Sequence, residues 1–294
     1  MSARETGAIH DIGYRRYDGP RLGTAYIARS LFVTSLRGAF GMGRSARSKV
    51  MPFLLLAVML LPALIIAAVV VITKADELPI EYTSYAVHLS AVVFLFVGAQ
   101  SPQAVSRDLR FRVVSLYFSR PLSRRSYVQA KLTAMTAALF GLLAAPLVVL
   151  YAGALLGGLA FWDNTGDVLA GLVGAALFAV TLASLGLLIA AWTPRRGIGV
   201  AAIVAVLVVL FGVSAIVAGI AQDQGNETLA GWAGLISPFT IVDGVQVWAL
   251  GAESSTVTGP PGQAGGPVFA TAMVALVGLC YLLLLRRYRG ATLA

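Results

Sequence analysis

The stretch VMPFLLLAVMLLPALIIAAVVVI, residues 50–72, decides the fold class of this chain, because it contains no Asp, Glu, Lys or Arg. A bilayer core about 30 Å thick needs about 20 apolar residues for each helical crossing. Backbone amides cannot remain unpaired in lipid, and an unbroken apolar run without period-two alternation favours a helix over a barrel strand. The stretch therefore predicts a transmembrane helix.

Five further runs of the same kind follow along the chain and predict five further crossings. They are residues 85–105, 132–156, 168–192, 198–221 and 268–285. Hydrophobic residues make up 58% of the sequence and charged residues 12%, which is too little charge to cover a water-facing surface. We predict an all-α, polytopic membrane protein with six transmembrane helices.

The charges are divided unevenly between the loops that join these runs. Residues 1–49, 106–131, 193–197 and 286–294 hold 21 of the 22 basic residues, whereas the intervening loops hold only Lys74 and nine of the 13 acidic residues. Cytoplasmic loops of membrane proteins carry an excess of Lys and Arg. We therefore expect a multi-pass protein of the cell membrane with both termini in the cytoplasm, whose basic excess contacts anionic lipid rather than nucleic acid.

The first 49 residues form a basic leader, and residues 50–294 form the membrane domain. Because about fifty polar and basic residues precede the first apolar run, we expect no cleavable signal peptide. Residues 21–42 lack proline and predict an amphipathic connecting helix in the inner membrane interface, where arginines can snorkel. Its interfacial residues are expected to be Tyr26, Arg29, Leu36 and Arg37.

The cytoplasmic loop at residues 106–131 predicts two short helices that meet at a corner. Leu109, Val113, Leu116 and Tyr117 have helical spacing, although the segment could also suit a short strand. Pro121 ends the first helix, because the residue before proline avoids helical geometry. Ser123 can cap the second helix, with Leu122 and Tyr127 at the two staple positions.

Arg124 and Arg125 follow that cap, where the helix dipole disfavours cations by about 0.3–1 kcal/mol. Lipid phosphates, or an acidic groove on a cytoplasmic partner, must offset this cost. Both alternatives remain open from the sequence.

Residues 228–250 are apolar but poorly suited to crossing a membrane. Three glycines and Pro238 interrupt the segment, which also contains Asp243. Irregular backbone is tolerated at membrane depth only where protein or water covers it. We expect a pair of short re-entrant helices on the outer face, with Pro238, Phe239 and Asp243 forming an outer gate.

Catalytic and nucleotide-binding motifs are missing from the sequence. No lysine follows a glycine, so there is no Walker A loop, and the two histidines cannot form a zinc-protease motif. The six apolar runs contain no Asp, Glu, Lys or Arg, whereas secondary carriers and intramembrane enzymes normally use such groups. We expect that this chain is not an enzyme and binds no cofactor of its own.

The order of these features resembles the permease subunits of ABC-2-type transporters, also called type V ABC exporters. The resemblance covers nearly the whole chain: connecting helix, six spans, a long loop after the second span and re-entrant helices before the sixth. Its most specific part is SRPLSR at residues 119–124 with Lys131 downstream, which is similar to the coupling region of the family. The leader YRRYDGPR at residues 14–21 is similar to one found in such permeases.

The resemblance implies two separately encoded ATPase subunits, which bind ATP and Mg²⁺, and a second permease that is identical or homologous. It implies that ATPase closure moves the loop at residues 106–131 and drives a cargo across the membrane, in the outward direction of an exporter. The alternatives are a multi-span enzyme or scaffold acting on a lipid, and a secondary carrier. The residues expected to couple to the ATPase are Arg107, Asp108, Arg110, Leu116, Tyr117, Arg120, Pro121, Arg124, Arg125 and Lys131.

Overall fold

The computed structural model describes residues 22–110, 122–193, 195–256 and 258–290, together with Gly13, Gly19 and Tyr117. These residues form helices and connecting turns without a strand, as the sequence predicts. The helices long and apolar enough to cross a membrane are α2 (Ala46–Thr73), α7 (Arg124–Gly157), α8 (Phe161–Trp192), α9 (Arg196–Asp223) and α12 (Gly262–Gly290). The shorter helices are α1 (Thr24–Ala39), α3 (Tyr85–His88), α4 (Ser90–Ala104), α5 (Ser106–Arg110), α10 (Glu227–Trp232), η1 (Ala233–Ile236) and α11 (Pro238–Leu250).

The predicted crossing at residues 85–105 differs from the expected uninterrupted helix. Leu89 leaves helical geometry, with φ −108° and ψ 27°, and separates α3 from α4. The 15 residues of α4 extend about 22 Å, which is less than the roughly 30 Å of a bilayer core. Ten of those residues are buried by neighbouring helices. Most of α4 is therefore covered by protein, whereas Leu89 at the break is half-buried.

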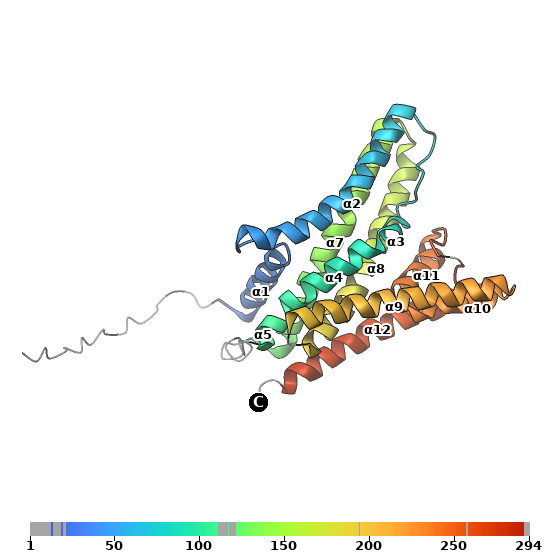
Figure 1. The fold of residues 1–294 in the computed structure, drawn as a ribbon. Helices are drawn as coiled ribbons and strands as arrows, with labels where there is room; N and C mark the ends of the chain where they lie inside the picture. Colours follow the sequence, from blue (N-terminus) through green and yellow to red (C-terminus); the bar gives the residue numbers. More distant parts are fainter. Residues whose placement is uncertain are drawn as a thin grey trace, which may run out of the picture.

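The long helices form two groups that meet at one end of the molecule. The first group contains α2, α7 and α8, and α7 packs between the other two. The second group contains α9, α11 and α12, and α11 contacts the other two. The two groups touch where α8 contacts α12. Figure 1 shows α2, α7 and α8 diverging from α9 and α12, with α1 and α5 near the end where the groups meet. The short helix α4 contacts both groups, through α7 and α8 on one side and α9 on the other.

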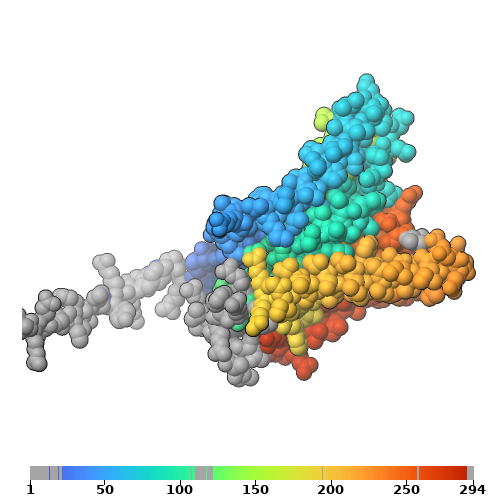
Figure 2. Space-filling view, viewed as in Figure 1, coloured from blue at the N-terminus to red at the C-terminus, as the bar shows by residue number. Residues whose placement is uncertain are grey.

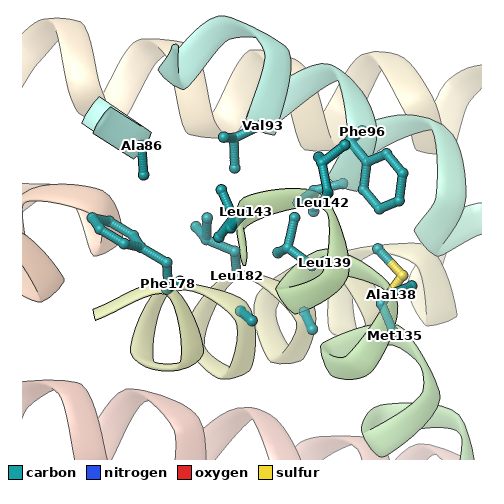
Figure 3. Close-up of a cluster of buried hydrophobic side chains, with 14 of the residues drawn as sticks. Ala86, Val93, Phe96, Met135, Ala138, Leu139, Leu142, Leu143, Phe178 and Leu182 are labelled. Atoms are coloured by element: carbon teal, nitrogen blue, oxygen red, sulfur yellow. The ribbon is translucent and has the colours of Figure 1, made fainter. Parts of the chain in front are cut away.

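The hydrophobic core lies where α4, α7 and α8 meet. Figure 3 shows side chains of the three helices pointing toward one another, among them Val93, Phe96, Leu139, Leu142, Phe178 and Leu182. These six side chains have no solvent exposure. On the surface, α4 is visible between α2 and α9 (Figure 2). The core is therefore built around a helix that is too short to cross the membrane alone.

Glycines bring α2 and α7 into close contact. A Cβ atom added at Gly153 of α7 would lie 2.3 Å from the Cβ of Ala67, and one added at Gly157 would lie 2.8 Å from a methyl of Val70. Small residues let helix backbones approach closely in lipid, where packing rather than the hydrophobic effect drives association. The position of α2 on α7 thus depends on these two glycines.

The charged loops gather at opposite ends of the helices. The basic end, as we call it, comprises α1, residues 40–49, α5, the start of α7, the α8–α9 junction and the end of α12 (Figure 1). The other end, the acidic end, carries a cavity of about 360 Å³. Its acidic lining residues are Asp76, Glu77, Glu81, Asp163 and Asp167.

Candidate functional site

The start of α7 has the cap that the sequence predicts. Ser123 has extended backbone geometry, and its Oγ accepts a hydrogen bond from the backbone N–H of Ser126 at 3.1 Å. Leu122 and Tyr127, at the staple positions, are both buried. Arg124 and Arg125 are exposed in the first turn. The chain therefore restarts as a helix at a fixed place and presents two arginines at the basic end.

Asp108 of α5 and Lys131 of α7 form an ion pair beside this cap. Lys131 Nζ lies 2.9 Å from Asp108 Oδ2, and the two side chains are only 9% and 17% exposed, respectively. The Tyr127 hydroxyl donates a hydrogen bond of 2.7 Å to the same carboxylate oxygen. Tyr127 and Lys131 are four residues apart on α7 and so project from one helix face. We call Asp108, Tyr127 and Lys131 the clamp, because they hold α5 against α7.

The clamp continues into α12 through aromatic contacts. The ring centroid of Tyr127 lies 5.6 Å from that of Tyr117 and 5.1 Å from that of Tyr288. Tyr288 belongs to the last turn of α12 and is 1% exposed. Aromatic pairs of this kind contribute about 0.5–1.5 kcal/mol beyond their buried area. One buried ring thus joins the loop at residues 106–131 to α7 and α12.

The same turn of α12 also binds α8. Arg287 Nε donates a hydrogen bond of 3.3 Å to the carbonyl of Ala191, and its guanidinium lies 6.0 Å from the ring centroid of Trp192. The last carbonyls of a helix have no partner within the helix, so this donor satisfies one of them. The end of α12 is thereby fixed to two helices.

Sequence reasoning missed Tyr288 and Arg287 as members of the site. Residues 286–289 read Arg-Arg-Tyr-Arg, which the charge pattern explains as a basic flank of the last crossing. The available signal was a tyrosine inside that basic cluster, since an aromatic ring there can pack inward while the arginines point outward. Its partner on α7 cannot be identified from spacing.

Several predicted coupling residues are not placed by the structure. Leu116, Arg120 and Pro121 lie outside the described residues, as does the leader at residues 14–21 apart from Gly19. Arg107 and Arg110 belong to α5, but their side chains are also outside the described part. The predicted corner at Pro121 therefore stays a prediction.

The connecting helix α1 packs on the bundle through residues other than those predicted to lie in the membrane interface. Leu31 and Ala39 are its buried residues, and α1 contacts α7 and α4. Tyr26 is 56% exposed, Arg29 and Arg37 are exposed, and Leu36 is half-buried. The bundle thus leaves the predicted interfacial residues largely uncovered, and their contact with the membrane interface stays a prediction.

The residues predicted to form an outer gate are buried within the bundle. Pro238 begins α11, and Phe239 follows it with no solvent exposure. The ring of Phe239 lies 4.5 Å from Phe178 of α8, 5.2 Å from Phe94 of α4 and 5.6 Å from Phe211 of α9, between centroids. Phe239 is therefore the point where α4, α8, α9 and α11 converge.

Asp243 lies one turn further along α11 and is 2% exposed. Thr256 Oγ1 donates a 3.4 Å hydrogen bond to Asp243 Oδ2. Burial raises the pKa of the Asp243 carboxyl to about 6, although hydrogen bonds from Ser255 and Thr256 oppose the shift. This acid lies under the segment that follows α11. Within the described ranges, no group of three or more His, Cys, Asp or Glu side chains is placed to hold a metal ion.

Comparison with known proteins supplies the family. No curated protein matches the chain. A family model described as "ABC-2 family transporter protein" matches residues 72–286, which are 215 of the 294 residues. The match includes α5, the whole of α7 and the short helices α10 and α11, so it contains the clamp and the Phe239 cluster, by which we mean Phe239 with Phe94, Phe178 and Phe211. The chain therefore belongs to the ABC-2 family and is a multi-pass membrane permease component of an ABC transporter.

Proposed function

We propose that this permease couples ATP hydrolysis in a separate ATPase subunit to substrate export, and that residues 106–131 receive the motion of that subunit. ABC-2 membrane subunits generally work with an ABC ATPase partner. The observation that supports this chain's part in coupling is the clamp, because Asp108 joins α5 to α7 through both Lys131 and Tyr127.

The clamp is suited to transmit displacement because it is costly to break. Removing one partner of a buried ion pair costs about 3–5 kcal/mol, since the other charge is left without compensation. A force on α5 therefore moves Lys131 together with Asp108 rather than separating them. The 34 residues of α7 extend about 51 Å, so a change in its tilt at the basic end is carried along the helix into the bundle.

The proposed outer gate is the Phe239 cluster. Its rings come from α8 of the first group, from α9 and α11 of the second group, and from α4, which contacts both. A change in the angle between α8 and α9 must alter the contacts of Phe239 with Phe178 and Phe211. We propose that the transport cycle loosens these contacts and re-forms them.

The proposed assembly has the basic end and both termini in the cytoplasm of a cell whose plasma membrane holds the protein. Two ATPase subunits, which bind ATP and Mg²⁺, would meet the basic end, and a second permease, identical or homologous, would complete the transporter. Arg124 and Arg125 support this arrangement, because two exposed cations next to the clamp suit an acidic groove on a partner. In this proposal the chain itself binds neither nucleotide nor metal.

The test is charge reversal of Arg124 and Arg125 to Glu in the tagged full chain, expressed in its native host. The matched control reverses Arg195 and Arg196, which are exposed at the same end but lie outside the loop. We expect the first variant to lose the co-purifying ATPase and its cargo-dependent activity, and the control to keep both. The proposal fails if no ATPase accompanies the wild-type chain. It also fails if the Arg124/Arg125 variant behaves like the control.

A further inference from the structure

A second cavity lies at the basic end, between α1, α4, α5 and α7. Its volume is about 270 Å³, and α1 contributes Thr34, Ser35 and Gly38 to its wall. Gln103 at the end of α4 and Arg44 in the turn before α2 also line it. The clamp residues Asp108 and Lys131 also line it. The cavity therefore borders the ion pair on which the proposed coupling depends, although its own chemistry does not require that function.

The charges of the lining favour an anion. Arg44 and Lys131 supply two positive charges, whereas Asp108 supplies one negative charge, which leaves the cavity at +1. By contrast, the cavity at the acidic end is lined by five carboxylates without Lys or Arg. Lys131 is held by Asp108, but a carboxylate and a second anion can share one ammonium group, because the ammonium has three donors.

Arg44 is held in position over the cavity. Its Nη1 donates a hydrogen bond of 2.6 Å to Gln103 Oε1. The other terminal nitrogen, Nη2, lies 3.7 Å from the position of a Cβ atom added at Gly38, so the guanidinium lies against the glycine face of α1. A planar guanidinium with several N–H donors suits the oxygens of a phosphate group.

Ser35 provides an independent indication that something binds here. Its Oγ is buried and has no hydrogen-bond partner. Leaving a buried hydroxyl unpaired costs about 1–3 kcal/mol, so such groups normally bind a ligand or an ordered water. Ser35 lines the same cavity as the two cations Arg44 and Lys131. An oxygen-rich anion would satisfy both the hydroxyl and the positive charge.

The surroundings of Arg44 indicate the source of that anion. Arg44 precedes α2 by two residues, and the first turns of α2 expose Val50, Phe53 and Leu54, between 46% and 62%. An anion at Arg44 is therefore at the end of an exposed apolar helix face in a membrane protein. Basic pockets between helices at the membrane surface bind lipid headgroups. We propose that this cavity binds the phosphate group of an anionic phospholipid from the leaflet that meets the basic end.

The first test measures binding of soluble probes to the purified full chain in mild detergent. The probes are dioctanoylphosphatidylglycerol, dioctanoylphosphatidylcholine and inorganic phosphate, titrated in microscale thermophoresis. We expect saturable binding of the anionic lipid and an affinity about tenfold lower for Arg44→Gln, since a charge-assisted hydrogen bond is lost. Arg47→Gln is the matched control, because Arg47 is exposed in the first turn of α2 and does not line the cavity.

The second test removes space without changing charge. An added Cβ at Gly38 meets only Arg44 Nη2, at ordinary contact distance, so Gly38→Ala fits and is expected to bind like wild type. Gly38→Leu extends into the cavity and is expected to abolish binding while α1 stays helical by circular dichroism. Equal affinity for inorganic phosphate and the anionic lipid would overturn the lipid source. Absence of anionic-lipid binding, or equal losses for Arg44→Gln and Arg47→Gln, would overturn the site itself.

Discussion

Removing both charges of the clamp should destabilise the permease no more than removing either one alone. In Asp108→Ala, the ammonium of Lys131 would remain 9% exposed without its carboxylate, and Tyr127 would lose the acceptor of its 2.7 Å hydrogen bond. Breaking a buried pair costs about 3–5 kcal/mol, and because Asp108 keeps 17% exposure we expect about 3 kcal/mol. Lys131→Met, which keeps the length of the side chain, should cost about the same.

The double variant Asp108→Ala/Lys131→Met separates a true pair from two independent losses. With no charge left buried, it should cost about 3 kcal/mol, whereas independent contributions would add to about 6 kcal/mol. The expected coupling energy is therefore about 3 kcal/mol. The measurement is unfolding of the full chain in mixed micelles titrated with sodium dodecyl sulfate, followed by circular dichroism.

Two further variants control this experiment. Tyr127→Phe keeps the ring contacts with Tyr117 and Tyr288 but removes the hydroxyl, and should cost about 1.5–3 kcal/mol, as expected for a hydrogen bond to a charged group. Arg125→Ala removes an exposed cation from the same helix and should change stability by less than about 0.5 kcal/mol. If the single variants add in the double variant, α5 and α7 are not held by this pair and the reasoning on transmission is refuted.

Three other substitutions test different parts of the structure. Gly153→Ala should lower the melting temperature in detergent, because its methyl group would overlap Ala67, whereas Gly141→Ala on the same helix meets nothing within 4 Å and should be neutral or stabilising by up to about 1 kcal/mol. Asp243→Asn should raise the melting temperature relative to wild type above pH 6. The pKa of Asp243 is raised from 3.8 to about 6 in the folded state, so its ionisation costs no stability below pH 3.8. The cost grows between pH 3.8 and 6 and reaches about 3 kcal/mol above pH 6. A difference in melting temperature between variant and wild type that does not depend on pH would contradict this. Phe239→Ala should cost about 3–5 kcal/mol in the same micelle titration, since it removes a fully buried ring, and a loss below 1 kcal/mol would mean that the cluster is already loose.

Features that depend on neighbours in sequence were predictable. The cap at Ser123 and the buried staple residues Leu122 and Tyr127 follow from local chemistry and agree with the structure. The long uncharged runs predict α2, α7, α8, α9 and α12, because length and hydrophobicity alone determine whether a helix can cross a bilayer.

Features that depend on distant partners were not predictable. A helix buried by protein and one surrounded by lipid can have the same apolar composition, so the break at Leu89 gives no signal in residues 85–105. The family resemblance groups Asp108 and Lys131 in one coupling loop, but nothing in the sequence shows that their side chains are in contact. The ring contact between Tyr288 and Tyr127 joins residues 161 positions apart and depends on how α12 packs against α7.

A proline lies between the clamp and the contact of α7 with α2. Pro146 lies about four turns beyond Lys131, and it cannot donate the backbone hydrogen bond that would continue the helical ladder. The part before Pro146 carries the clamp, whereas the part after it is fastened to α2 through Gly153 and Gly157. A twist imposed on the first part can thus be absorbed at the proline, which would let α2 stay anchored in the bilayer while the centre of the bundle turns. Replacing Pro146 with Ala would restore the missing backbone hydrogen bond, so that a twist of the first part would pass to the second part and to α2.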